Sequence, residues 1–470
     1  MDITQCTDNL TQFRNGLYQS FGNRADTLME LLDAICSVGD ASSVVEYSLA
    51  ACFRRSYSTI FKAINEMEIE ESWLTQQVSP YLARPRQWPF WLLMVDVTPS
   101  PRRYAPTLAD RGMVYQPEVV KGKKPVTIGH QYSTVVLGLE ATAGVTASWV
   151  VPLLTERVAT AQDKERVGAQ QVDRLLADAQ LPFGCELTVE VGDTSYSKPS
   201  YLHAHRQHPH LVSVGRVRGN RTFYQRYVAA AEEETERGHP TWYGAKFSLS
   251  DPESWTVPDE TLTFDESSHR GKLYRIEVQA WHNMLMTGTY KPQRLSMHEY
   301  PFTLVRIVRY DAQGHSITKR PLWLLVMGQR RHELTLRHIF EAYACRFNLE
   351  HFFRFGKQKL LLADFQTPQV EREEKWWQFV HIAYAQLWMA RHIAHALPRP
   401  WERNLPLMQR RLISPTLVQR DFARIIRQLG TPAQPPKRRG ISPGRRPGTL
   451  LPKRPRHKVV VKSQITAHPT

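Results

Sequence analysis

The sequence predicts an α/β protein: a mixed sheet flanked by helices, with a β-rich insertion, an N-terminal helical domain and C-terminal helices. Three observations support this fold class. Apolar residues recur at spacings of three and four in the first 85 residues and again beyond residue 331, as in helices. Short apolar runs of strand type lie between these regions, and two of them end in a carboxylate. With 470 residues, 42% of them hydrophobic, the chain can bury a substantial core.

Residues 1–85 are expected to form the helical domain, which ends near Pro80 and Pro85. Within it, residues 48–66 have the length and the basic start of a helix-turn-helix. In that interpretation two arginines meet DNA phosphates and three further side chains face a groove: Arg54, Arg55, Tyr57, Ser58 and Lys62. Packing within a plain helical bundle explains the same pattern, and the sequence leaves both interpretations open.

Residues 86–219 are expected to form the first part of the sheet. Segments typical of strand, strand, strand, helix, strand, helix and strand follow one another at 89–98, 133–140, 148–154, 163–180, 185–196, around 201 and 210–219. Asp96 and Asp193 each end a strand, at the sheet edge where open α/β sheets bind ligands. A turn-forming aspartate is the common explanation for either one alone. Because each is flanked by apolar residues, ionisation is costly unless a cation lies nearby, and the pair therefore indicates a functional site.

The rest of the folded chain divides into three expected regions. Short strand-like pieces with polar loops predict a β-rich insertion over 220–330. A core helix with its flanking residues is expected over 331–375, and C-terminal helices over 376–430.

One stripe of the helix around residue 350 is charged, although its other sides are largely apolar. At about 100° per residue, four polar side chains fall within an arc of roughly 60°: Tyr343, Arg346, Glu350 and Lys357. Such a stripe fits a carboxylate metal ligand flanked by a cation and a phenol that hold phosphates. An internal salt-bridge stripe is the alternative.

The order Tyr343, Arg346, Glu350 and Lys357 resembles the Tyr-Arg-Glu-Lys signature of bacterial insertion-sequence transposases with an RNase H-like DDE core. The resemblance extends to the two strand-end aspartates, the β insertion and the N-terminal helices. It implies that Asp96, Asp193 and Glu350 form a catalytic triad that binds two Mg²⁺ ions, which Mn²⁺ can replace. It also implies DNA cleavage at the element's ends, followed by strand transfer into target DNA.

The same resemblance implies DNA-binding roles for other residues. Arg346, Tyr343 and Lys357 would grip phosphates near the scissile bond. Trp323 stands where the family places a tryptophan that stacks on an unpaired base, and a core tryptophan is the alternative. Separately, Arg216 and Arg218 follow the strand after Asp193 and are expected either to contact the DNA backbone or to lie in a solvated loop.

Positive charge is concentrated at the C-terminal end. The net charge is +16, and residues 431–470 hold ten of the 61 basic residues, none of the 45 acidic ones and eight prolines. This region is expected to be a disordered basic tail that wraps on phosphates, or else a merely solubilising one. The expected partner is double-stranded DNA, as terminal inverted repeats and target, bound by a homodimer.

Several function classes are not expected. Five well-separated cysteines argue against a disulfide framework or a zinc site, and no targeting or membrane segment is expected. The histidines at 203, 205, 208 and 210 are expected at a surface helix end rather than on a metal. The predicted setting is the bacterial cytoplasm, in association with the nucleoid. A non-catalytic DNA-binding protein and a structure-directed nuclease or resolvase remain alternatives to a transposase.

Overall fold

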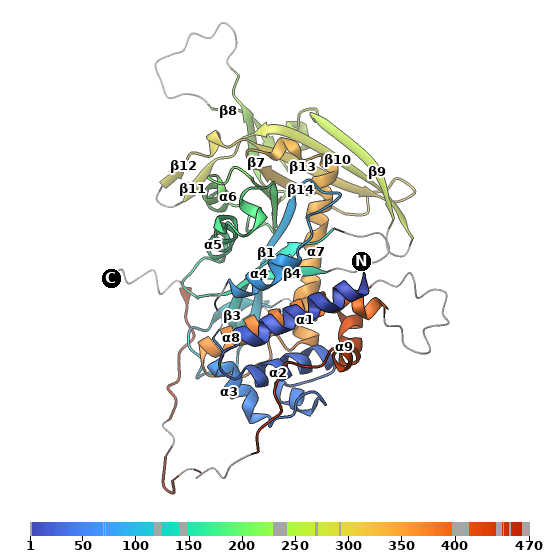
Figure 1. Ribbon diagram of the computed structural model, residues 1–470. Coiled ribbons are helices and arrows are strands. Elements are labelled where there is room, and N and C mark those ends of the chain that lie inside the picture. Colours follow the sequence, from blue (N-terminus) through green and yellow to red (C-terminus); the bar gives the residue numbers. More distant parts are fainter. Residues whose placement is uncertain are drawn as a thin grey trace. The chain divides into compact units, whose positions relative to one another are not determined.

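The computed structural model divides into two compact units (Figure 1). Unit 1 comprises Met1–Ala83, Val97–Val167 and Asn348–Thr470, and unit 2 comprises Arg84–Asp96 and Gly168–Phe347. The structure describes residues 2–68, 70, 72–116, 125–140, 149–228, 242–267, 271–290, 293–396, 413–438, 444, 446–450 and 453–462. Residues 397–412 of the expected C-terminal helical region and parts of the expected tail lie outside these ranges.

The mixed α/β fold is confirmed by a ten-stranded sheet whose strands are hydrogen-bonded in the order β2-β3-β1-β5-β6-β14-β13-β10-β9, with β4 paired to β3. The strands are β1 (Trp91–Pro101), β2 (Gly112–Tyr115), β3 (Val126–Gly138), β4 (Val150–Val158), β5 (Thr188–Gly192), β6 (Leu211–Val217), β9 (Glu260–Ser267), β10 (Leu273–Met284), β13 (Phe302–Tyr310) and β14 (Leu322–Met327). Of these, β1, β5 and β6 pair in parallel. Parallel strands are typically buried on both faces, which explains the continuous apolar runs of the sequence.

Helices α5 (Lys164–Ala177), which belongs to unit 2 from Gly168 onward, and α6 (Pro199–His205) follow the order expected from the sequence. Gly168 of α5 lies directly over β1, where an added Cβ would be 3.0 Å from both Val95 and Tyr196. The helix therefore approaches the strand closely only because this position is glycine. Val95 faces α5, so the neighbouring Asp96 points to the opposite face of the sheet.

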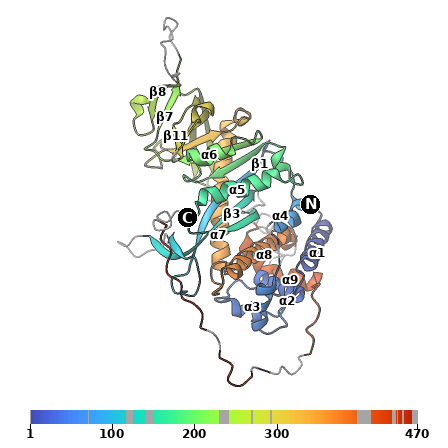
Figure 2. The ribbon, with the colours of Figure 1, turned by 90° about the vertical axis from the view of Figure 1, so that its left-hand side faces the viewer.

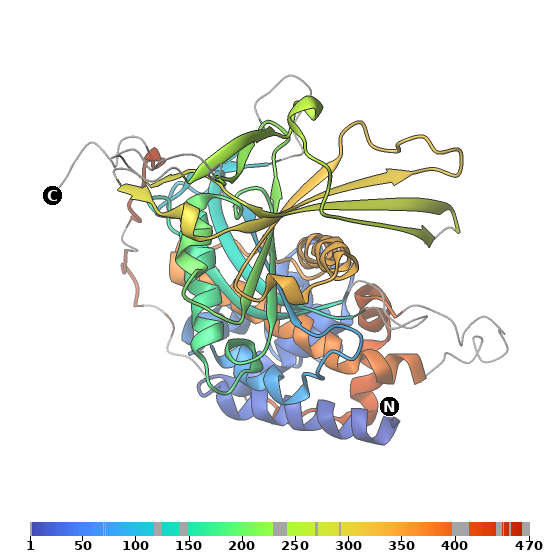
Figure 3. The same ribbon diagram turned by 90° about the horizontal axis from the view of Figure 1, so that it is seen from above.

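The expected β-rich insertion forms the antiparallel part of the sheet in unit 2. Strands β14, β13, β10 and β9 pair in succession, and β7 (Thr222–Arg226) pairs with β8 (Tyr243–Ser248). The first part of α7 (Leu336–Lys359) packs on this sheet (Figure 3). The ring of Phe340 on this helix lies 5.2 Å from that of Phe264 on β9. The guanidinium of Arg337 lies 4.1 Å from the same Phe264 ring.

Unit 1 is built around α8 (Val370–Ala396), which contacts α1 (Ile3–Ser20), α2 (Ala25–Ser37), α9 (Pro415–Leu429) and β4 (Figures 1 and 2). Its side chains are buried on all sides over most of its length, and Trp377 stacks on Tyr132 of β3 at 3.9 Å. Even so, no helix in the described ranges combines the length and the apolar character that crossing a membrane requires.

The proposed helix-turn-helix differs from its prediction. Residues 44–49 form a 3₁₀ helix rather than the expected α-helix, and α3 covers Ser58–Glu66. Arg54 and Arg55 both contact the buried carboxylate of Glu30 on α2. In this structure the two arginines therefore help to pack a helical bundle, which favours the second interpretation.

Two parts of the tail contact the rest of unit 1. Near its start, Gln434 donates its backbone N–H to Asp26 at 2.8 Å, and Arg55 donates to the carbonyl of Gln434 at 2.8 Å. Farther along, the backbone N–H of Val460 donates to the carbonyl of Arg111, and Lys462 pairs with Asp163 at 2.6 Å. These described parts of the tail are thus held at two places, which the sequence did not reveal.

A buried ionic network joins the end of β1 to the start of α8 and to the segment that precedes it. Arg102 donates to Glu373 at 3.2 Å and to the carbonyl of Phe365 at 3.2 Å. Ser100 donates to the same carboxylate at 2.9 Å, and His130 lies 3.4 Å from it. Burial alone would raise the pKa of Glu373, but His130 and Arg102 hold it below its ordinary value.

We expect Glu373→Gln to lower the free energy of unfolding by about 3 to 5 kcal/mol, because it leaves the buried guanidinium of Arg102 without its counter-charge. Urea-induced unfolding measures the loss. Glu66→Gln, which breaks the exposed pair with Arg24, is the matched control and should have a much smaller effect. Equal losses in the two variants would contradict the structural role of the network.

Candidate functional site

Asp96 and Asp193 lie at the same level on neighbouring parallel strands. The last paired residues of β1 and β5 are Met94 and Val191, and each aspartate follows two positions later. Adjacent strands are about 4.8 Å apart, so the two carboxylates start from neighbouring backbone positions at the carboxyl ends of these strands. One oxygen of Asp193 accepts the backbone N–H of Ser195 at 2.7 Å, so this aspartate also forms a turn.

Asp96 forms an ion pair with Arg346 of α7. Nη2 of Arg346 lies 3.2 Å from Oδ2 of Asp96, and both side chains are 16% exposed. A partly buried carboxylate is costly to leave uncompensated, and the guanidinium supplies the opposite charge. Two of the side chains singled out in the sequence, 250 residues apart, thus meet in unit 2.

Arg216 lies beside the two aspartates along the same row of strands. Gly192 of β5 pairs with Gly215 of β6, so Arg216 stands level with Asp193. Its side chain is exposed, as is that of Arg218. Both therefore remain available to a charged ligand at this end of the sheet. Arg221 instead packs over the ring of Phe223, and burial lowers its pKa.

The four residues of the expected stripe all belong to α7. Tyr343 and Arg346 precede the boundary between the units, and Glu350 and Lys357 follow it. Glu350 is partly exposed and lies one helical turn after Arg346 on the same helix. In unit 1, Nζ of Lys357 donates to Thr98 Oγ1 at 2.7 Å and to the carbonyl of Pro99 at 2.8 Å. Lys357 thereby fastens the end of α7 to β1.

Trp323 lies in the hydrophobic core of unit 2 rather than on a surface. It is 2% exposed, and its ring is 5.2 Å from that of Trp255 and 5.7 Å from that of Trp281. In this structure its ring face is covered by other aromatic side chains. The geometry favours the interpretation of Trp323 as a core tryptophan over a role in stacking on a base.

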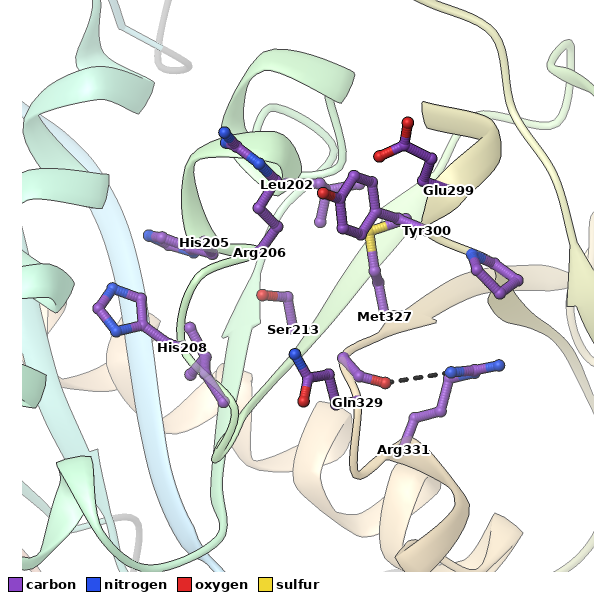
Figure 4. A pocket seen from close by; sticks show the side chains of 13 residues that line it. Leu202, His205, Arg206, His208, Ser213, Glu299, Tyr300, Met327, Gln329 and Arg331 are labelled. Atoms are coloured by element: carbon purple, nitrogen blue, oxygen red, sulfur yellow. Dashed lines mark hydrogen bonds between the residues drawn. The ribbon is translucent and has the colours of Figure 1, made fainter. Parts of the chain in front are cut away.

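The histidine group is more deeply placed than expected. His205 is only 4% exposed, and Nδ1 lies 3.1 Å from the buried carboxylate of Glu190, so the surface prediction is wrong for this residue. Burial would lower the pKa of His205, but Glu190 and Asp173 together raise it. Figure 4 shows His205 and His208 next to each other at a cavity of about 100 Å³.

Sequence reasoning missed Glu190, although a charged residue within the strand segment Thr188–Gly192 was the available signal. Its carboxylate accepts hydrogen bonds from Tyr201 and Ser213. Glu190 and Asp193 lie three positions apart on an extended chain, so they belong to opposite faces of the sheet. The Glu190 cluster is therefore separate from the edge where Asp193 and Asp96 lie.

A divalent ion is compatible with the aspartate pair, although no group of three His, Cys, Asp or Glu side chains that could hold a metal is found within the described ranges. Mg²⁺ prefers oxygen ligands and commonly binds through one or two carboxylates together with substrate phosphates. Asp96 and Asp193 supply two carboxylates from rigid strands. Arg346 would have to share Asp96 with such an ion.

Comparison with known proteins identifies the family. Residues 16–288 match the model of a family described as DDE superfamily endonuclease. The match covers more than half of the chain, and the chain therefore belongs to this family. The matched residues include both aspartates and end before the stripe on α7. No curated protein matches the sequence.

We expect Arg346→Gln to raise the affinity of the DNA-free protein for Mn²⁺ by about 3- to 10-fold, because Asp96 then loses the cation that competes with the metal. Isothermal titration of the full chain measures the change. Arg337→Gln, which breaks the pair with Glu341 on the same helix, serves as the control. A weaker or unchanged Mn²⁺ affinity in Arg346→Gln would show that the ion does not bind at Asp96.

Proposed function

We propose that this DDE superfamily endonuclease is a DNA transposase of the insertion-sequence type, which cleaves the ends of its element and joins them to target DNA. The observation that supports the proposal is the position of Asp96 and Asp193 at the carboxyl ends of neighbouring parallel strands, together with the ion pair between Asp96 and Arg346. Glu350 lies one turn after Arg346 on α7 and is proposed to complete a catalytic triad with the aspartates.

DDE-type endonucleases generally use divalent ions, and we propose two Mg²⁺ ions, which Mn²⁺ can replace, held by Asp96, Asp193 and Glu350. Bound there, the ions would supply the charge that activates an attacking oxygen and stabilises a departing one. The protein's own contribution is to hold the three carboxylates on a rigid sheet and a rigid helix, so that little reorganisation accompanies the reaction.

The surrounding cations are proposed to bind and orient DNA. Arg346, with its planar fork of donors, suits a phosphate near the scissile bond once Asp96 is shared with a metal ion. Tyr343 and Lys357 from the same helix are proposed to contact neighbouring phosphates. For Lys357 this requires release from Thr98 and Pro99, its present acceptors. Arg216 and Arg218 are exposed at the same end of the sheet and are proposed to contact the DNA backbone.

The proposed partner is double-stranded DNA, both as the terminal inverted repeats of the element and as target. A net charge of +16 supports a polyanionic ligand. Two element ends must be processed together, and we propose that a homodimer does so. The proposed setting is the bacterial cytoplasm, in association with the nucleoid.

Two other functions can be separated from this one by experiment. A non-catalytic DNA-binding protein would use the same basic surfaces, with carboxylates that serve only the fold. A structure-directed nuclease or resolvase would share the metal chemistry but leave no joined target strand.

We expect Glu350→Gln to lower Mg²⁺-dependent cleavage of a duplex carrying the element's end by at least about 100-fold, because the substitution removes a charged metal ligand. Electrophoresis of end-labelled DNA detects both nicked and joined products. Asp96→Asn and Asp193→Asn should have the same effect.

Glu371→Gln, which changes an exposed carboxylate of unit 1, is the control and should cleave normally. Full activity in Glu350→Gln would refute the catalytic assignment. Cleavage by the unaltered protein without any joined product would favour the nuclease or resolvase. If the protein binds the duplex but never cleaves it under any divalent ion, the non-catalytic function is supported.

Deletion of residues 431–470 should flatten the dependence of log affinity on log salt concentration, because ten basic side chains are lost. Fluorescence anisotropy of labelled duplex DNA at several salt concentrations measures the slope. An unaltered slope would mean that the tail makes no phosphate contacts.

A further inference from the structure

A basic pocket lies in unit 1, where the C-terminal half of α7 meets α8 and the start of α9. Its volume is about 230 Å³. Helices α8 and α9 pack side by side (Figures 1 and 2). Every polar side chain that lines the pocket can donate a hydrogen bond: His351, Arg354, Gln358, Lys359, Tyr384, Ser414 and Thr416.

The charge of this pocket favours an anion. Arg354 and Lys359 are cations, and no carboxylate belongs to the lining within the described part of the chain. Nζ of Lys359 donates to the carbonyl of Gly39 at 3.1 Å, which holds this ammonium in place while leaving its charge uncompensated there. Arg354 is exposed, and no hydrogen bond or ion pair joins it to another described residue. Its guanidinium is therefore available to a ligand.

The walls of the pocket are rigid. Gln419 of α9 is buried and donates to the carbonyl of Lys359 at 3.1 Å, which fixes α9 against the end of α7. Ser414 caps α9, with its side chain accepting the N–H of Leu417. The amino end of this 15-residue helix adds a partial positive charge at the pocket.

The inner wall of the pocket is aromatic. Tyr384 of α8 lines the pocket and is fully buried, with its ring 5.9 Å from that of Phe355. The two rings shield this side of the pocket from solvent, which strengthens the attraction between the cations and an anion.

We propose that this pocket binds a backbone phosphate of the DNA substrate, with Arg354 as its principal contact. The inference rests on the proposed function, because it takes DNA as the ligand. Arg354 lies one turn beyond Glu350 on α7, about 6 Å along the helix axis. That separation is close to the rise of two nucleotides, about 3.4 Å each. The pocket would thus hold the strand near its point of cleavage and set its register there.

The test is the salt dependence of DNA binding by the full chain with Arg354→Gln. Binding of labelled duplex DNA without divalent ions should weaken about 5- to 10-fold. The slope of log affinity against log salt concentration should become less steep by about one, which is the contribution of one phosphate contact. The control is Arg427→Gln, which removes the same charge from an exposed position at the other end of α9 and should change neither quantity. Thermal unfolding of both variants verifies that the fold is retained.

Three outcomes would overturn the inference. The first is an affinity and a slope in Arg354→Gln equal to those of the unaltered protein. The second is an equal loss in both variants, which would indicate nonspecific electrostatics. The third is a loss of inorganic phosphate binding by Arg354→Gln with DNA affinity intact, which would assign the pocket to a free anion. Because no measurement in this test involves cleavage, it can succeed or fail independently of the transposase proposal.

Discussion

The parallel pairing of β1 with β5 is the constraint on which the candidate site depends. Its register sets Asp96 level with Asp193, and the pairing of β5 with β6 adds Arg216 to the same row. The apolar runs that bury these strands fix the register, because a shift by one residue would turn every side chain to the other face. The polar residues that follow the runs are thereby carried to one edge of the sheet.

Charge compensation is the second organising principle of this protein. Three carboxylates that are removed from bulk water each have a basic side chain beside them. The pairs are Asp96 with Arg346, Glu373 with Arg102, and Glu190 with His205. The three pairs differ in accessibility. Glu373 and Glu190 are fully enclosed, which suits structural roles, whereas the pair of Asp96 and Arg346 retains some exposure and can be rearranged by a ligand.

Much of this architecture can be predicted from the sequence, because apolar residues recur with different periods in strands and in helices. This difference allowed prediction of the strand at 89–98, the helix around residue 350 and the β-rich insertion. It also allowed Asp96 and Arg346 to be predicted as candidate site residues. The residues whose roles the sequence leaves open share a different property. The charge of Arg54 and Arg55 is compatible with DNA contact and with bundle packing, because their partner Glu30 is fixed only by tertiary packing.

The same limit applies to buried polar residues and to tryptophan. A histidine such as His205 of α6 carries no local signal of burial, because its carboxylate partner comes from strand β5. Trp323 has the same apolar neighbours in sequence whether it stacks on a base or on Trp281. The network of Arg102 and Glu373 spans 271 residues and could not be found by spacing rules, which see only neighbours along one helix or strand.

The two attachment points of the tail limit how far it can extend. Between Gln434 and His457, both bound to unit 1 through their backbone N–H groups, the chain has a contour length of roughly 80 Å. A chain segment attached at both ends can extend from its attachment points by at most about half of its contour length. Such a segment also loses less conformational entropy when it binds a ligand than a terminus attached at one end only, because the second attachment already restricts it. As long as both attachments hold, the arginines of this segment can therefore contact only DNA that lies within this distance of the attachment points.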